Sequence, residues 1–143
     1  MKNIETKIKK AYSDLQQLGI SARITVKASN NMLYDYPVYG DLILREQNED
    51  DCLFMEDRVK VVIKIQSENI NRYGSIKDEL KCTDRKSKSI LGGNVTYFWQ
   101  DDVNAILGRG DGVYCFGKNL REAVRCCEVL EKVVKKSVAY PVL

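Results

Sequence analysis

The chain has 143 residues, of which 23 are Lys or Arg, 20 are Asp or Glu, and none is histidine. This length fits a single domain, and 44% hydrophobic with 30% charged residues is typical of a folded globular protein rather than a disordered one. The absence of histidine excludes Ser-His-Asp and Cys-His catalysis, imidazole metal ligation and any histidine-based pH switch. The remaining possibilities are chemistry of carboxylates, lysine, tyrosine or thiols, or binding without chemistry.

The net charge of +3 is too small to indicate a polyanionic partner. The most basic segment runs from Lys81 to Lys88, but Asp84 interrupts it and no aromatic residue is present for base stacking. A solvated loop is the favoured interpretation of this segment, and nucleic-acid binding is the remote alternative.

The N-terminal ten residues are charged throughout and lack the apolar segment of a signal peptide. No apolar run approaches the roughly 20 residues that span a bilayer. The five cysteines are odd in number and include no CxxC motif, which favours reduced thiols. We therefore expect a cytoplasmic protein without a membrane partner.

The predicted elements begin with a helix over residues 4–18, because apolar residues recur there at steps of three and four. Gly19 follows where a left-handed residue ends a helix. Residues 23–27 alternate polar and apolar side chains, as a half-buried strand does. The tyrosines around Pro37 indicate a packed loop or an interface: Tyr34, Tyr36 and Tyr39.

The middle of the chain is richer in strand signals. Residues 41–45 form a plausible short strand, and residues 46–51 are acidic and expected in solvent. Residues 59–65 are β-branched almost throughout and give the strongest strand prediction. Residues 71–93 have no clear period, so we expect turns and one short helix there.

The C-terminal third is the clearest part of the sequence. Residues 103–107 and 113–116 are short apolar strands, joined by a glycine-dense loop that fits a hairpin. Asn119 and Glu122 form the capping box of a final helix. Its apolar stripe consists of Ala123, Val124, Cys127, Leu130, Val133 and Val134. A helix, several strands and a second helix indicate an α+β or a three-layer α/β/α domain.

The segment from Asn104 to Ala123 resembles the class II aldolase/adducin family. Members carry a strand, an Asn-His-Gly, a second strand, a Gly-Lys turn, and a helix that begins Leu-x-Glu-Ala and continues to a Leu-Glu pair. The turn here is Gly117-Lys118, and the final pair is Leu130-Glu131. Upstream, residues 61–67 match the family's Ala-Val-Val-His-x-His-Ser strand, with Ser67 as the closing serine.

The resemblance implies one shortened class II aldolase-like domain over residues 1–143. It implies a three-layer α/β/α fold with a mostly antiparallel central sheet. Members generally assemble as ring-like homotetramers, so the resemblance also implies a homo-oligomer.

Three family histidines bind zinc, and the matching positions here are Lys64, Gln66 and Asp111. A protonated lysine has no lone pair to offer a metal, and glutamine is a weak neutral ligand, so only Asp111 is a good one. This set does not suit zinc. The family reaction uses zinc as a Lewis acid, so we expect neither a metal, nor another cofactor, nor that reaction.

Two functions remain open after the loss of the zinc ligands. The first is a non-catalytic scaffold that binds a small molecule or a protein partner, with Lys64 and Asp111 as an ion pair in the vacated metal pocket. The second is a metal-independent lyase or isomerase acting on a sugar phosphate or related carbonyl compound, with a Schiff base on Lys64 beside Asp111. The candidate residues for the ligand pocket are Gln66, Ser67, Gly110 and Gly112.

The family's acid/base glutamate falls near Arg45 or Glu46 by spacing. Glu46 is therefore a third catalytic candidate. The competing interpretation is that Glu46 belongs to the acidic loop that follows it.

Overall fold

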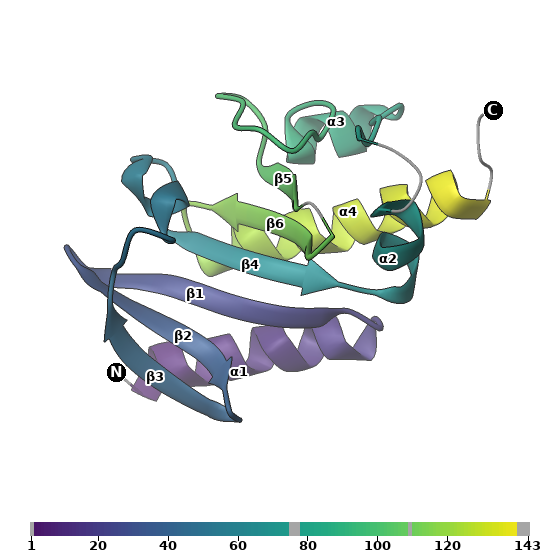
Figure 1. Cartoon of the computed structure of the whole chain (residues 1–143). Coiled ribbons are helices and arrows are strands. Elements are labelled where there is room, and N and C mark those ends of the chain that lie inside the picture. Colours follow the sequence, from purple (N-terminus) through teal and green to yellow (C-terminus); the bar gives the residue numbers. More distant parts are fainter. Residues whose placement is uncertain (1, 75–77, 109, 140–143) are drawn as a thin grey trace.

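The computed structural model describes residues 2–74, 78–108 and 110–139. In chain order its elements are α1 (Lys2–Gln17), β1 (Ser21–Ser29), β2 (Met32–Val38), β3 (Asp41–Glu46), the 3-10 helix η1 (Cys52–Met55), β4 (Val61–Gln66), α2 (Glu68–Gly74), α3 (Arg85–Leu91), β5 (Ala105–Gly108), β6 (Gly112–Gly117) and α4 (Leu120–Ala139). The six strands form one antiparallel sheet in the order β3-β2-β1-β4-β6-β5. The predicted α/β fold with a mostly antiparallel central sheet is confirmed (Figure 1).

The main core lies between the sheet and the helices. Ile24, Ile63 and Ile65 point from the sheet towards helix residues such as Leu15 and Leu130, and all five are fully buried. Such aliphatic side chains each contribute about 1.5–3 kcal/mol when removed from water. Because the helices cover this face of the sheet, contacts with ligands or partners are left to the opposite face.

A smaller core covers part of the opposite sheet face. Val62 and Phe116 project there from β4 and β6, and Phe54 of η1 packs against them. The Trp99 ring stacks on the Phe116 ring at a centroid distance of 5.4 Å. Because successive side chains of a strand point to opposite faces, Lys64 shares this face with Val62.

Helix α1 follows the predicted apolar pattern except at its end. Ile8, Ala11 and Leu15 are buried in the main core. The helix stops at Gln17, and Gly19 has the left-handed φ of +79° that was predicted for its C-terminal end. Leu18 therefore lies beyond the helix and is 55% exposed, so the predicted end of the helix at residue 18 is wrong.

Strand β2 corrects the prediction of a loop around Pro37. Residue pairs connect β2 to β1 on one side and to β3 on the other. Pro37 lies where the pairing with β3 is irregular, between Asp35 and Val38, so its missing N–H is tolerated. The Tyr36 ring packs edge-on against Tyr12 of α1 at 5.2 Å, as part of the main core rather than of a loop.

Two short helices, rather than one, occur between residues 68 and 91. Asp84 begins α3, since its side chain accepts hydrogen bonds from the backbone N and Oγ of Ser87 at 2.8 and 2.7 Å. The prediction of a loop for the basic segment is therefore wrong from Arg85 onwards, where α3 begins, although Lys86 and Lys88 on this helix are exposed as expected. Gly92 ends the helix with a φ of +88°.

Helix α4 begins as its sequence predicts. The Asn119 side chain accepts from the Glu122 backbone N at 2.9 Å, and the Glu122 carboxylate accepts from the Lys118 backbone N. Val124 of the predicted stripe is only partly buried, whereas Cys126 and Val129 are buried in addition to the rest of the stripe. In the described parts of the chain, neither α4 nor any other helix has the length and apolar character needed to cross a membrane.

Candidate functional site

Lys64 and Asp111 form the predicted ion pair. Lys64 extends from β4 on the sheet face opposite α1 and α4, and Asp111 lies in the turn between β5 and β6. The distance from Lys64 Nζ to Asp111 Oδ2 is 3.4 Å. The two side chains are 36% and 50% exposed, so the pair lies open to small molecules from solvent.

Tyr114 completes this pair from the neighbouring strand. It lies directly opposite Lys64 in the pairing of β4 with β6, and its hydroxyl donates to Asp111 Oδ2 at 3.0 Å. The Lys64 Nζ atom is 5.8 Å from the centre of the Tyr114 ring. Burial, followed by the hydrogen bond and the charge of Asp111, raises the pKa of Tyr114 to about 12. At neutral pH the phenol therefore keeps its proton and acts as a donor.

Gln66 and Gly112 hold the turn against β4. The Gln66 side-chain amide donates to the Asp111 carbonyl oxygen at 3.1 Å. Gly112 has a φ of +104°, and a Cβ atom there would collide with the Ile65 carbonyl oxygen. Only glycine permits this approach, which brings Asp111 within reach of Lys64. Gly110 has a φ of +80° and is exposed, with open space around it.

Ser67 is buried and contacts α4 rather than the Lys64–Asp111 pair. Its hydroxyl donates to Glu131 Oε2 at 2.7 Å and accepts from the Ile70 backbone N at 3.1 Å. Asn69 Nδ2 donates to the other Glu131 oxygen at 3.1 Å. These contacts give Ser67 a structural part, as the cap of α2 and the link to α4.

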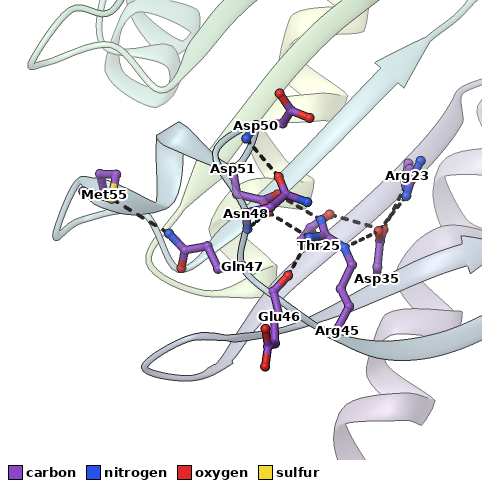
Figure 2. Close-up of polar contacts among 10 residues, drawn as sticks. All are labelled: Arg23, Thr25, Asp35, Arg45, Glu46, Gln47, Asn48, Asp50, Asp51 and Met55. Carbon is purple, nitrogen blue, oxygen red and sulfur yellow. Dashed lines mark hydrogen bonds and ion pairs between the residues drawn. The ribbon is translucent and has the colours of Figure 1, made fainter.

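Glu46 ends β3, and β2 and β1 lie between that strand and β4. With neighbouring strands about 4.8 Å apart, the structure does not bring Glu46 to Lys64. Its side chain is exposed, and in Figure 2 it points away from a neighbouring cluster of polar side chains around Asp35. Arg45, the other position that spacing indicated, points into that cluster instead.

The cluster is centred on Asp35, whose side chain has no solvent exposure (Figure 2). Arg23 donates to both of its carboxylate oxygens at 2.9 and 2.6 Å, and Arg45 donates to one of them at 3.0 Å. Burial opposes the charge on Asp35, but the hydrogen bonds from Arg23 and Arg45 outweigh it and lower the pKa of Asp35. No local pattern in the sequence indicates this buried carboxylate.

Arg45 links Asp35 to Asp51. Its Nη1 and Nη2 atoms donate to the two oxygens of Asp51 at 2.8 and 2.9 Å. This bidentate pair lowers the pKa of Asp51, and the Asn48 backbone N supports it at 2.9 Å. The expectation that residues 46–51 are all in solvent is therefore wrong for Asp51, which is mostly buried.

The residues at the three zinc positions do not suit a metal. Lys64 donates hydrogens, Gln66 is engaged with a backbone carbonyl, and only the Asp111 carboxylate is an anionic ligand. Within residues 2–74, 78–108 and 110–139, no three His, Cys, Asp or Glu side chains are grouped to hold a metal ion. These side chains therefore differ from the zinc ligands of the resemblance in their chemistry, because they offer one anionic donor and no imidazole.

No family model and no curated protein matches this sequence. Solved structures match it closely in shape. An L-fuculose 1-phosphate aldolase has a TM-score of 0.71 at 12% identity, over 97% of this chain and 88% of that one. The l-fuculose-1-phosphate aldolase of Thermus thermophilus has a TM-score of 0.73 at 12% identity, over 94% of this chain and 93% of that one.

The sugar-phosphate aldolase of Thermotoga maritima has a TM-score of 0.67 at 14% identity, over 99% of this chain and 98% of that one. Together these matches show that the chain has the class II aldolase fold, as the motifs predicted. At such identities the similarity establishes the fold, while activity has to be argued from the site.

Proposed function

We propose that the chain is a non-catalytic class II aldolase-like domain, a repurposed scaffold that binds a small molecule at the Lys64–Asp111 pair. The observation that carries the proposal is the cluster at the zinc positions of the resemblance. Lys64 pairs there with the Asp111 carboxylate, Gln66 donates to the Asp111 carbonyl oxygen, and Tyr114 donates to the carboxylate. A protein partner at this face is the alternative ligand.

The chemistry of the sheet face favours an oxygen-rich or anionic ligand. Lys64 supplies an ammonium group, and Arg23 lies directly opposite Lys64 in the pairing of β1 with β4. The Arg23 side chain remains 55% exposed although it contacts Asp35. Since the matching structures are named for sugar-phosphate aldolases, phosphorylated sugars are the first ligands to test.

A Schiff-base enzyme is the second candidate, because the structure brings Lys64 to Asp111. Nucleophilic lysines are typically desolvated in an apolar pocket or lie beside another cation. Lys64 is instead partly exposed and has a carboxylate as its neighbour. This environment favours binding over covalent catalysis.

The test combines metal analysis, ligand binding and covalent trapping on the purified protein. We expect substoichiometric zinc, no cleavage of L-fuculose 1-phosphate with or without added zinc, and a thermal shift with sugar phosphates that Lys64→Ala removes. A tight equivalent of divalent metal that Asp111→Ala abolishes would contradict the proposal. So would a borohydride-trapped adduct on Lys64 with any candidate aldehyde or ketone.

The resemblance also leads us to propose a homotetramer. Large apolar side chains exposed in the single chain offer surface for contacts between copies: Leu44, Met55 and Phe98. Sedimentation velocity across a concentration series tests this directly. A single species with the mass of one chain at all concentrations would contradict it.

A further inference from the structure

A cavity of about 310 Å³ is lined by residues from the end of β6, from α3 and from the first turns of α4. None of the residues of the Lys64–Asp111 cluster lines it. Its volume is at the lower end of the range for ligand pockets, which suits a small molecule rather than a macromolecule. The charged side chains in its lining are Arg58, Lys118, Glu122 and Arg125.

Arg58 is held rigidly at this cavity by neutral partners. Its Nη2 atom donates to the carbonyl oxygens of Gln100 and Val103 at 3.1 and 2.9 Å, and its Nη1 atom donates to the Asn104 side chain. The guanidinium also lies 4.5 Å from the centre of the Trp99 ring. Three of the five N–H donors of an arginine are therefore used, which leaves two. The Arg58 guanidinium is therefore held in one orientation before any ligand binds, and no neighbouring carboxylate in the part of the chain that the structure describes neutralises its charge.

Lys118 and Arg125 add two further cations on the rim. Neither they nor Arg58 form an ion pair with a carboxylate among the described residues. Charges of both signs act on the Cys126 thiol in the cavity lining. Burial, followed by the charges of Cys115 and Glu122, raises the pKa of Cys126 to about 12, and the charges of Arg125 and Arg58 oppose that rise.

One carboxylate, Glu122, faces the same cavity. Its Oε2 atom is committed to the Lys118 backbone N at 2.9 Å, in the capping arrangement that begins α4. Three cations therefore stand against one carboxylate with a fixed structural contact. The positive end of α4 lies at the same place and reinforces the surplus.

We propose that this cavity binds a small phosphate-type dianion, either inorganic phosphate or the phosphate group of a phosphomonoester. Arg58 supplies a positive charge that its neutral partners hold in place, and Arg125 and Lys118 close over the anion from the rim. An anion is the ligand class that a rigid guanidinium with neutral partners and a local surplus of positive charge recognises.

The experiment titrates the full chain with inorganic phosphate, and separately with glycerol phosphate, at ionic strength held constant with chloride. Binding is followed by the thermal midpoint and by backbone NMR shifts. We expect Arg125→Ala and Lys118→Ala each to raise the Kd about tenfold, the loss of one charge-assisted hydrogen bond. Arg121→Ala is the matched control, since Arg121 lies on the same helix outside this cavity.

Binding of inorganic phosphate alone identifies the free anion as the ligand, and binding of glycerol phosphate alone identifies the phosphomonoester; either supports the proposal. No stabilisation by either probe beyond chloride would overturn it. An equal loss of phosphate affinity in Arg121→Ala would mean that only the overall charge of the protein matters, and this would overturn the proposal as well. A loss in Lys64→Ala that the two rim variants do not share would place the anion at the sheet face instead, which rejects this cavity.

Discussion

The Ser67 hydroxyl donates to Glu131 across 2.7 Å and so joins the end of β4 to the middle of α4. Both residues close motifs through which the sequence resembles the class II aldolases. They are 64 positions apart in the chain. Their contact gives both residues a structural part in this chain: it ties the strand to the helix, away from the Lys64–Asp111 pair.

We predict that Ser67→Ala lowers the free energy of unfolding by about 2 kcal/mol, because Ser67 both bonds a charged carboxylate and caps α2. Urea denaturation measures the change. Ser137→Ala is the control, since the Ser137 hydroxyl donates to the Val133 carbonyl within α4 rather than to a charged group, and its effect should stay within about 0.5 kcal/mol. Equal effects of the two substitutions would show that the link between motifs does not stabilise the fold.

The sequence predicted helices and strands best where a regular apolar pattern extends over many residues. The helix near residues 4–18, the strand near 59–65 and the last helix were all found, because many apolar positions agree there. Strand β2 was missed because Pro37 and three tyrosines dominate a short segment. A short helix was expected between residues 71 and 93, but the bounds of α3 were not, because its seven residues carry no apolar period and its start depends on the side chain of Asp84.

The candidate site was predictable only in part. The resemblance brought Lys64, Gln66 and Asp111 together, and their contacts are present. Tyr114 was missed because its place beside Lys64 depends on the register between two strands, which no local pattern reports. The cluster around Asp35 was missed for the same reason, since its partners come from β1 and β3.

Asp35→Asn should cost about 3 kcal/mol of stability at pH 7, because it leaves Arg23 and Arg45 facing a buried neutral group. The pKa of Asp35 is lower in the folded chain than in the unfolded one. Its stabilisation is therefore complete above the unfolded value of about 3.9 and is lost as the pH falls through the folded value.

Denaturation at several pH values between about 6 and 2 checks this sign. The wild type should lose stability in acid more steeply than Asp35→Asn, with Asp51 supplying the remaining slope because its pKa is also lowered. Asp50→Asn changes an exposed neighbour and should follow the wild type. Parallel curves for Asp35→Asn and the wild type would show that Asp35 is not ionised against the two arginines.

The turn that carries Asp111 gives a matched pair of glycine substitutions. Gly112→Ala places a Cβ atom against the Ile65 carbonyl and 2.8 Å from Gln66 Cγ, so we expect a loss of about 3 kcal/mol or more. Gly110→Ala meets no atom within 4 Å, and only its φ of +80° costs energy, about 1 kcal/mol. Thermal unfolding compares the two. Similar midpoints would mean that β6 does not approach β4 this closely.

The convergence of Lys64, Gln66 and Asp111 predicts that zinc binding can be introduced by substitution. Lys64 and Gln66 are two residues apart on β4 and share a face, and the Asp111 turn contacts both. A variant with Lys64→His, Gln66→His and Asp111→His presents three imidazoles, which is the ligand number of an open zinc site. Since the pair it replaces is partly exposed, the change costs about 1 kcal/mol or less, and the variant should fold.

Equilibrium dialysis followed by metal analysis should find about one zinc ion bound per chain in the triple variant. Gln66→His alone is the control: it keeps the Lys64 ammonium, which repels a divalent cation, and should stay free of metal. Circular dichroism establishes that each variant is folded before metal is added. A folded triple variant that binds zinc no better than the wild type would show that the three positions do not converge closely enough to hold a metal ion. Zinc binding in the triple variant alone would mean that this sequence keeps the geometry of a metal site while its side chains serve another use.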